Sequence, residues 1–400
     1  MTNEVKNIPK LRFPEFIEEW CNKDVGQVVN VYDGTHQTPK YTNKGIKFLS
    51  VENIKTLKSN KFISKEAFEK DFKVRPEFGD ILMTRIGDVG TPKVVNSNED
   101  LAYYVSLALL KPKSIYSYFL EALIKSPTIQ NEIWRKTLHI AFPKKINKNE
   151  IAKIMISYPK SEEQEKIGNF FSKLDRQIEL EEQKLEKLEG QKKGYMQKIF
   201  SQELRFKDEN GNTFEEWKNT NFNYFMSEPD NLEKGIDLRK DQLLTVKLEG
   251  NGVSKANINR ALKMGSTVYY KRFAGQFIYG KQNFFNGAFG IVPKFLNNYY
   301  SSGDVPALNI DYSKIDSKYF INYISRKDYY KKKEAFSTGT GSKRIHEKTL
   351  LDFDIMLPSV EEQEKIGDFF SEIDNFIEKQ SYKVELLKER KKGFLQKMFV

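Results

Sequence analysis

The sequence predicts an α+β fold in which two mixed α/β domains are separated by two long antiparallel coiled-coil helices with pseudo-two-fold symmetry. Three observations predict this fold. The chain of 400 residues is too long for one hydrophobic core. A long helical pattern occurs twice, and each copy follows a block of short β-like runs. The expected segments are a first domain at 1–158, a first helix at 159–202, a second domain at 203–357 and a second helix at 358–400.

The duplication is clearest where each helix starts. The motif Glu-Glu-Gln-Glu-Lys-Ile-Gly at 162–168 returns at 361–367, and the register then holds without a gap to the end of both helices. A leading segment repeats as well, because Leu-Arg-Phe at 11–13 returns at 204–206. Each half therefore consists of a leading segment, a variable block and a long helix, and Met1 is expected near the end of the second helix.

Both helices carry residues at the 3,4 spacing of a coiled-coil seam. The seam positions are Phe171, Leu174, Ile178, Glu181, Leu185, Leu188, Lys192, Tyr195 and Ile199, and then Phe370, Ile373, Ile377, Gln380, Val384, Leu387, Lys391, Phe394 and Met398. Because the first helix leads away from one block and the second leads back, mutual pairing is antiparallel. The alternative is two amphipathic helices that lie on separate domain cores.

Each block between the helices is expected to contain short strands and to end in a helix. The strand-like runs are Ile46–Val51, Asp80–Thr84, Lys93–Val95 and Val105–Leu110, and then Leu243–Leu248, Thr267–Tyr270, Gln276–Tyr279 and Phe289–Val292. The helices are expected near Tyr116–Trp134 and Asp316–Phe336. Loops at 34–39 and 284–287 are places where polar side chains can be held out on a rigid base.

The charge distribution favours an anionic partner. With 66 Lys and Arg against 55 Asp and Glu, the net charge is +11. The excess lies in the two blocks, which carry about +7 and +5, whereas the helices are close to neutral. We find neither a long apolar run nor a secretory signal in this sequence, so we expect a cytoplasmic protein.

Residues for metal chemistry are scarce. The single cysteine, Cys21, cannot form an internal disulfide, and we expect it to lie in the core. Together with only three histidines, it gives no Cys/His zinc site. We expect no metal and no cofactor.

Catalytic motifs are missing from the sequence as well. It has no Pro-Pro pair, which a DNA methyltransferase uses to hold a flipped base, and no Gly-rich loop for a methyl donor. The run Gly-Thr-Gly-Ser-Lys at 339–343 lacks the spacing of a phosphate loop. Pro-Asp at 229–230 resembles a nuclease motif by chance, because metal-sharing carboxylates need wider spacing. We therefore predict a binding protein that is not an enzyme.

Basic clusters with Tyr, Asn and Gln between them indicate DNA as the ligand. The clusters at 144–145, 331–333 and 343–344 provide cations for phosphates, and the neighbouring amides suit base edges. A single cluster of this kind is more often a solvated surface. Two duplicated blocks that carry nearly all of the excess charge favour nucleic acid.

The duplicated helix start, the opening Pro-Lys-Leu-Arg-Phe-Pro-Glu-Phe at 9–16, the Asp-Gly-Thr-His-Gln-Thr-Pro loop at 33–39 and the stretch at 79–90 together resemble the specificity (S) subunit of type I DNA restriction-modification systems. The resemblance covers the whole chain. It implies two target-recognition domains that each read one half of a bipartite double-stranded DNA sequence. It also implies a non-catalytic subunit whose helices space these domains and dock methyltransferase (M) subunits, which recruit restriction (R) subunits. Because the helix starts are duplicated, we expect two M subunits per chain.

The resemblance and the polar loops give candidate residues. DNA binding is expected at Thr35, His36, Gln37, Thr38, Lys40, Arg85, Lys93, Lys144, Lys145, Lys271, Arg272, Lys281, Gln282, Asn283, Asn286, Ser342, Lys343 and Arg344. Partner binding is expected at Glu163, Gln164, Ile167, Phe170, Phe171, Glu362, Gln363, Ile366, Phe369 and Phe370. One alternative is a stand-alone two-domain DNA-binding regulator, which would bind its site without partners. The other is a structural coiled-coil adaptor, which would show no salt-dependent DNA affinity.

Overall fold

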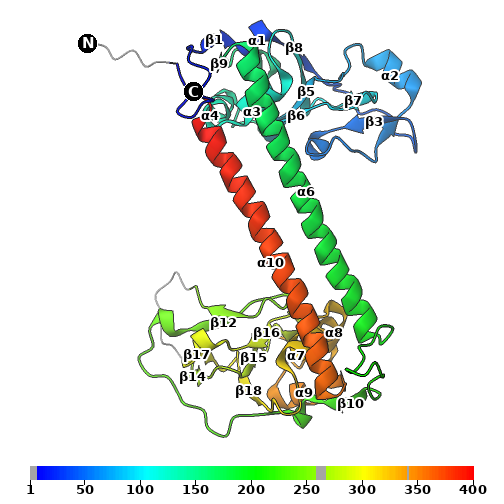
Figure 1. Ribbon diagram of the computed structural model, residues 1–400, viewed down its shortest axis with the longest axis vertical. Helices are drawn as coiled ribbons and strands as arrows, with labels where there is room; N and C mark the ends of the chain where they lie inside the picture. Colours follow the sequence, from blue (N-terminus) through cyan, green and yellow to red (C-terminus); the bar gives the residue numbers. More distant parts are fainter. Residues whose placement is uncertain (1–6, 258–266, 340–341) are drawn as a thin grey trace. The chain divides into compact units, whose positions relative to one another are not determined.

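The structure, a computed structural model, describes residues 7–257, 267–339 and 342–400. They belong to two compact units, which are both visible in Figure 1. Unit 1 spans Met1–Gln183 together with Ser381–Val400, and unit 2 spans Lys184–Gln380. Met1 itself, which we expect beside the second helix, lies outside the described residues. Among the residues that are described, no helix is long and apolar enough to cross a membrane.

Unit 1 is built on a four-stranded antiparallel sheet with the order β2-β8-β5-β6. The strands are β2 (Val29–Asp33), β8 (Leu107–Pro112), β5 (Ile81–Ile86) and β6 (Asp88–Val94). A second sheet, ordered β4-β3-β7, comprises β4 (Phe62–Ile63), β3 (Ile46–Leu49) and β7 (Leu101–Tyr103). The run Ile81-Leu82-Met83 is apolar at every position because both faces of β5 are covered. Ile81 and Met83 face the helices of the unit, and Leu82 faces the second sheet.

Five short helices complete unit 1: α1 (Val25–Val28), α2 (Lys65–Asp71), α3 (Ser117–Lys125), α4 (Pro127–Lys136) and α5 (Lys148–Ala152). The sequence predicts one helix at Tyr116–Trp134, but the structure has two. Ser126 ends α3, and its side chain accepts a hydrogen bond from the Ile129 backbone N–H to cap α4. Pro127 then occupies the first position of α4, where a missing N–H costs nothing.

Unit 2 repeats this plan with shorter strands. Its four-stranded sheet has the order β11-β18-β15-β16, with β11 (Met226–Ser227), β18 (Ala307–Ile310), β15 (Phe277–Tyr279) and β16 (Phe289–Ile291). Two further pairs are β12 (Leu244–Val246) with β13 (Val253–Lys255), and β14 (Tyr269–Arg272) with β17 (Tyr299–Ser302). The helices are α7 (Ser317–Ile324), α8 (Lys327–Lys332) and α9 (Glu347–Leu351), so the expected helix at Asp316–Phe336 is also divided. The core is largely aromatic, and Phe277, Phe284 and Phe320 are fully buried in it.

A pair of strands closes each unit next to its long helix, and the sequence analysis does not predict them. In unit 1, β1 (Cys21–Asp24) pairs antiparallel with β9 (Met155–Tyr158). In unit 2, β10 (Lys218–Asn221) pairs in the same way with β19 (Asp354–Leu357). The expectation of a buried Cys21 is wrong: it lies on an exposed strand and is itself exposed. The inward position belongs to Trp20, which is 3% exposed.

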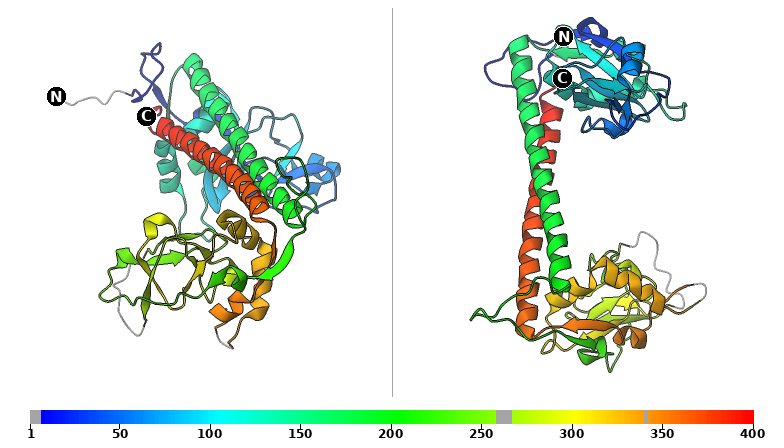
Figure 2. Two further views of the ribbon diagram at one scale, coloured as in Figure 1. Left: turned by 60° about the horizontal axis from the view of Figure 1, so that its bottom comes forward. Right: turned by 90° about the vertical axis from the view of Figure 1, so that its right-hand side faces the viewer.

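The two long helices are α6 (Ser161–Phe200) and α10 (Val360–Lys397), and each contributes one part to each unit. Within unit 1, the start of α6 lies against the end of α10, with ring centroids of Phe170 and Phe394 5.0 Å apart. Within unit 2, the end of α6 lies against the start of α10, with Tyr195 and Phe369 5.1 Å apart. Both views in Figure 2 show these helix segments side by side. The predicted fold of two repeated α/β blocks with two long helices is confirmed.

Candidate nucleic-acid interface

Three connections between strands or helices lie at one edge of the four-stranded sheet in unit 1. β2 and β5 both run antiparallel to β8, so their carboxyl ends lie at the same edge. The loop 34–40 follows β2, and the turn at Gly87 follows β5. A hairpin at 138–145 closes with a backbone hydrogen bond of 2.7 Å between its ends. Gly87 N donates to Lys144 O at 2.9 Å, which attaches the hairpin to the turn. We call this surface sheet edge 1.

The loop 34–40 begins with a glycine, because the backbone there passes close to a neighbouring segment. A Cβ on Gly34 would lie 2.4 Å from Tyr104 O, so a side chain does not fit there. The next residue is fixed on both sides: Thr35 N donates to Tyr103 O at 3.2 Å, and Thr35 O accepts from Val105 N at 2.9 Å. The polar side chains that follow thus start from a rigid base.

Arg85 is an anchor beneath sheet edge 1. Its side chain is 5% exposed, its Nε donates to Ile146 O at 3.0 Å, and its guanidinium pairs with the Asp33 carboxylate. The Arg85 carbonyl accepts from Ile146 N at 3.0 Å. Arg85 is thus buried and paired and supports the loops from inside the unit, and its DNA contact stays a prediction.

Most of the other predicted residues of the first block come together at sheet edge 1. Those with exposed side chains are His36, Gln37, Thr38, Lys40, Lys144 and Lys145. Neither Lys144 nor Lys145 forms an ion pair with any residue in the described ranges. Thr35 is half-buried, and its Oγ1 accepts from Gln37 N at 3.3 Å. Lys93 lies elsewhere, because it pairs with Leu82 at the end of β5 opposite to Gly87.

Unit 2 has a corresponding surface, sheet edge 2, formed by the connection 280–288 after β15 and by the described residues next to the antiparallel bridge between Thr338 and Arg344. Residues 340–341 of this segment lie outside the described residues. Ile345 N donates to Lys281 O at 2.9 Å, just as Ile146 N donates to Arg85 O in unit 1. Lys281 therefore occupies the position of Arg85. Its Nζ pairs with Glu347 at 2.8 Å, so it too is held inside the unit.

The remaining predicted residues of sheet edge 2 are exposed or paired with acids. Gln282, Asn283, Ser342 and Lys343 are exposed, although Lys343 Nζ lies 2.8 Å from a Glu334 carboxylate oxygen. Asn286 is half-buried, and its Oδ1 accepts from Lys331 Nζ at 2.8 Å. Arg344 lies 3.5 Å from Asp304. The cations of this edge are thus largely balanced, in contrast to those of sheet edge 1.

Arg272 and Lys271 stand on β14, outside the sheet that carries sheet edge 2. Arg272 is 2% exposed, its Nε donates to Ser301 Oγ at 2.7 Å, and its Nη2 donates to Val305 O at 3.2 Å. Burial lowers the pKa of Arg272 to about 10, which leaves it protonated at neutral pH. The guanidinium is thus enclosed in unit 2, and its role at DNA stays a prediction. Lys271 pairs with Glu233 at 3.0 Å.

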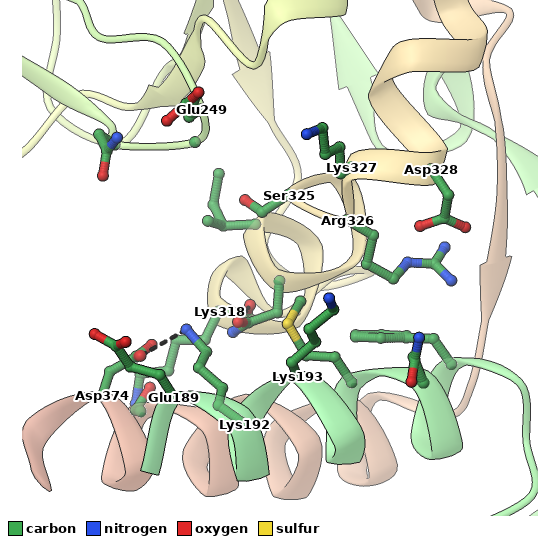
Figure 3. A pocket seen from close by; sticks show the side chains of 18 of the residues that line it. Glu189, Lys192, Lys193, Glu249, Lys318, Ser325, Arg326, Lys327, Asp328 and Asp374 are labelled. Atoms are coloured by element: carbon green, nitrogen blue, oxygen red, sulfur yellow. Dashed lines mark hydrogen bonds and ion pairs between the residues drawn. The ribbon is translucent and has the colours of Figure 1, made fainter. Parts of the chain in front are cut away.

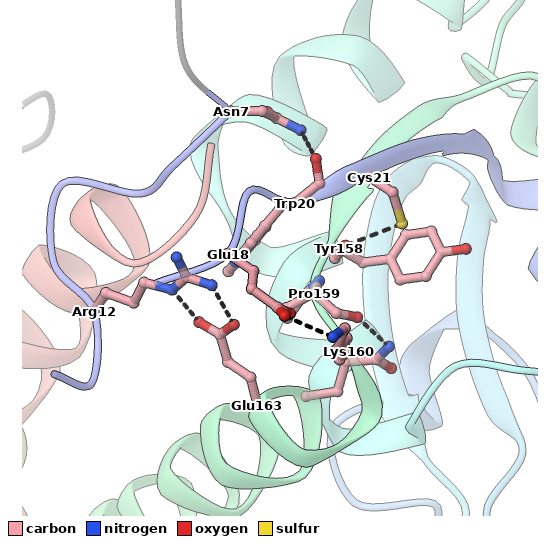
Figure 4. A network of polar contacts seen from close by, with 10 residues as sticks. Asn7, Arg12, Glu18, Trp20, Cys21, Tyr158, Pro159, Lys160 and Glu163 are labelled. Atoms are coloured by element: carbon pink, nitrogen blue, oxygen red, sulfur yellow. Dashed lines mark hydrogen bonds and ion pairs between the residues drawn. The ribbon is translucent and has the colours of Figure 1, made fainter. Parts of the chain in front are cut away.

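The repeated helix-start motif has a structural explanation, which Figure 4 shows for unit 1. Arg12 of the leading segment donates twice to Glu163, with both distances 2.7 Å, and Glu163 is 2% exposed. In unit 2, Arg205 donates to Glu362 at 3.2 and 2.7 Å, and Trp217 Nε1 adds a third hydrogen bond of 3.0 Å. A bidentate arginine explains why Leu-Arg-Phe and Glu-Glu-Gln repeat together.

The glutamine of the motif joins the long helix to the preceding segments. Gln164 accepts from Tyr116 N at 2.9 Å and donates to Pro159 O at 2.8 Å. Gln363 accepts from Asp316 N at 2.8 Å and donates to Pro358 O at 2.9 Å. These matching bonds satisfy backbone groups at the starts of α3 and α7, and they show that the two frameworks are equivalent.

The glycine that ends the motif lets the long helix approach a shorter one. A Cβ on Gly168 would lie 2.6 Å from Phe119 N, at the start of α3. In unit 2 the equivalent Gly367 would bring a Cβ to 3.1 Å from Tyr319 N, at the start of α7. Glycine is thus needed for close packing of the helices.

The predicted partner-binding residues are occupied inside the chain. Side chains that are at most 3% exposed are Glu163, Gln164, Ile167, Phe171, Glu362, Gln363, Ile366 and Phe370. Phe170 and Phe369 are half-buried, and both pack on the other long helix. The hydrogen bonds and apolar contacts of the motif thus join the leading segment, the block and the helix, and partner binding at these residues stays a prediction.

The helix pair carries a four-charge cluster in unit 1 that sequence analysis does not predict. Asp175 of α6 pairs with Lys391 of α10 and, at 3.1 Å, with Lys125 of α3, which also pairs with Glu121 at 2.7 Å. Burial alone would raise the pKa of Asp175, but the two lysines outweigh it and lower this pKa. Burial and then the nearby Lys125 lower the pKa of Lys391. Only a cavity of about 10 Å³ remains there.

The corresponding place in unit 2 is open. Lys192 of α6 lies 2.6 Å from Asp374 of α10, which repeats the Lys391–Asp175 pair. Counted from the equivalent starts of α3 and α7, Ile321 and Ser325 stand where unit 1 has Glu121 and Lys125. A cavity of about 1680 Å³ lies here, between α6 and the turn that leads into α8, as Figure 3 shows.

Comparisons with known proteins agree with the repeat. A family model described as type I restriction modification DNA specificity domain matches residues 17–190 and 212–386. The chain is similar in structure to the S subunit of a type I restriction-modification system from M. genitalium, with a TM-score of 0.63 and 15% identity over 98% of this chain and 99% of that one. It is also similar to the HsdS subunit from Thermoanaerobacter tengcongensis, with a TM-score of 0.45 and 15% identity over 100% of this chain and 99% of that one.

Proposed function

Because the chain belongs to the family of type I restriction-modification DNA specificity domains, we propose that it is the DNA sequence-recognition subunit of such a complex. It reads a bipartite double-stranded target, one half with each unit. It has no catalytic activity of its own and acts in the cytoplasm, where it docks two methyltransferase subunits and, through them, restriction subunits. The segments 1–158 and 203–357 serve as the recognition domains, and 159–202 and 358–400 as the spacer helices.

One observation supports this proposal above all others. Each unit holds a variable set of polar side chains at a sheet edge on a framework that is nearly identical in both units. A constant framework with variable loops suits a protein that reads two different half-sites in the same way. Direct readout depends on the side chains at the edge, and phosphate contacts need cations such as Lys144 and Lys145.

Partner binding is proposed for the long helices and the exposed neighbours of the buried motif. In α6 the motif exposes Glu162, Glu165 and Lys166 beside the buried Glu163 and Gln164. The duplicated framework gives the chain two such surfaces, which supports two methyltransferase subunits. The buried residues of the motif then hold the exposed residues of the docking surface in position.

An exchange of one recognition block tests the proposal. Residues 25–154 lie inside the β1–β9 pair, so replacing them with the same segment of another family member retains the Arg12–Glu163 bond. The exchanged chain, with its methyltransferase subunits, should methylate a target in which only one half has changed. Methylation-aware sequencing of the host genome identifies the target. Changes in both halves, or specific binding by the chain alone with no methylation in any complex, would contradict the proposal.

A further inference from the structure

We infer that unit 1, acting as the DNA-reading unit proposed above, inserts an apolar wedge between base pairs of its half-site. The wedge is the tip of the hairpin 138–145, which carries Ile140 and Phe142. These side chains are fully exposed, at 100% and 104% relative to the reference state. The chain thus leaves substantial apolar surface uncovered at one point.

Hydrogen bonds fix the base of the hairpin, so its tip projects from a rigid support. Its ends are joined by two backbone hydrogen bonds of 2.7 and 3.4 Å between residues 138 and 145. Ile146, directly after the hairpin, is fully buried and bonded to the buried Arg85 through both backbone groups. On the other side, His139 lies against Trp134, with ring centroids 4.7 Å apart and Nε2 2.8 Å from Trp134 O.

The surroundings of the tip favour DNA over a protein partner. Lys144 and Lys145 follow Phe142 almost directly, are exposed, and have no acidic partner among the described residues. Lysine is depleted in protein–protein interfaces, whereas a phosphate backbone needs such cations. The polar loop 34–40 lies at the same sheet edge, so apolar tip, cations and base-reading groups share one surface.

Apolar side chains next to cations are what DNA-bending proteins use to separate stacked base pairs. The insertion costs the stacking free energy of one base-pair step, and flexible pyrimidine–purine steps lower that cost. The wedge therefore also gives unit 1 a means of reading DNA deformability. We expect the half-site of unit 1, or the base pairs next to it, to contain such a step.

The corresponding segment of unit 2 has the same backbone pairing at its two ends but a different sequence, and its residues 340–341 lie outside the described residues. Thr338 and Arg344 exchange two backbone hydrogen bonds of 2.9 Å. Between them the sequence is Gly-Thr-Gly-Ser-Lys, which contains no large apolar residue. The two apolar side chains of the wedge thus have no counterpart in the sequence of this segment, which makes unit 2 an internal reference in the same molecule.

The test uses the full chain assembled with its methyltransferase subunits and duplexes of the target with 2-aminopurine at successive positions of both halves and the gap, except at the bases that the methyltransferase subunits flip out of the helix. We expect a several-fold rise of 2-aminopurine fluorescence at one step on the side of unit 1, and none on the side of unit 2. The double variant Ile140→Ala with Phe142→Ala should lose this rise and bind the target about 10–100-fold more weakly. Phe78→Ala is the matched control, because Phe78 is 62% exposed but precedes the opposite end of β5.

The outcomes separate this inference from the proposed function. Specific binding by the wild-type complex without any rise in fluorescence would overturn the wedge and leave the proposed function intact. A rise that persists in the double variant would overturn the wedge as well. Failure of the double variant to assemble, measured by light scattering, would show that the tip docks a protein. Absence of specific DNA binding by the wild-type complex would overturn the proposed function itself.

Discussion

The two units share a framework but fill the space beside their long helices in different ways. In unit 1, Lys125 and Glu121 close the space around the Asp175–Lys391 pair and leave a cavity of about 10 Å³. In unit 2, a serine and an isoleucine occupy the equivalent positions, and a cavity of about 1680 Å³ remains. The repeated residues are those whose side chains join segments through hydrogen bonds and ion pairs, and the positions around them differ between the units.

The same contrast holds at the sheet edges. Both hairpins close with the same backbone pairing, yet the first has an apolar tip and unpaired lysines, whereas the second is polar and its cations face acids. A duplicated fold therefore does not imply duplicated binding chemistry.

The largest effect is expected for loss of the buried helix-start carboxylates. Glu362→Ala leaves Arg205 and Trp217 without their acceptor, and Glu163→Ala does so for Arg12. Each should lower the free energy of unfolding of its own unit by about 3–5 kcal/mol, with Glu362→Ala at the upper end because one more donor is stranded. Hydrogen exchange resolved by segment measures both units in one chain.

The conservative change Glu362→Gln is the control, because it retains an acceptor and should cost less than the alanine variant. If Glu362→Ala destabilised both units equally, the units would not be independent in stability. If neither alanine variant had an effect, the framework would not depend on this bond.

An intermediate effect is expected at the helix-pair ion pairs. Asp175→Asn leaves Lys125 and Lys391 as like charges in partial burial, so unit 1 should lose about 1–3 kcal/mol. Asp374→Asn should cost about 0–1 kcal/mol, because Asp374 is 48% exposed beside an open cavity. Chemical denaturation of the two variants checks the difference. Equal losses would mean that the cavity of unit 2 does not matter for its ion pair.

The smallest effect is expected for single cations at the two sheet edges. Lys144→Ala and Lys145→Ala should each reduce the slope of log affinity against log salt by about 1, because each lysine is free to meet a phosphate. Lys343→Ala should reduce it less, since Glu334 already balances that charge. Binding of the assembled complex to its target at several salt concentrations measures the slopes. A larger decrease of the slope for Lys343→Ala than for Lys144→Ala or Lys145→Ala would contradict this prediction.

Much of the architecture could be predicted from the sequence because it is periodic or repeated. The 3,4 spacing predicts α6 and α10, and the double Glu-Glu-Gln-Glu-Lys-Ile-Gly motif predicts two equivalent halves. Short edge strands such as β1 and β10 escape prediction, because they carry polar residues and owe their conformation to the partners β9 and β19. The expected burial of Cys21 is wrong for the same reason, because Cys21 lies on β1, a strand that the sequence pattern does not predict.

Which candidate residues face outward is a tertiary property. Arg85 and Arg272 look like any basic residue in the sequence, but the fold surrounds them with carbonyl, hydroxyl or carboxylate acceptors, and they are buried. The helix-start motif looks like a docking surface because it repeats, yet it repeats because Arg12 and Arg205 each need a buried carboxylate. The only sequence signal for this pairing is that both motifs recur together.

The duplication, the two long helices and the excess of positive charge in the blocks can be predicted without a structure, because periodicity, repetition and composition are properties of the sequence. That loop 34–40 and the hairpin 138–145 share one edge depends on the tertiary fold, since β2 and β5 run in the same direction only because both pair with β8. The tertiary fold also decides that Lys144 and Lys145 are free while Arg85 is not. Burial and pairing depend on which distant residues the fold brings within a few ångströms, and no local pattern encodes that.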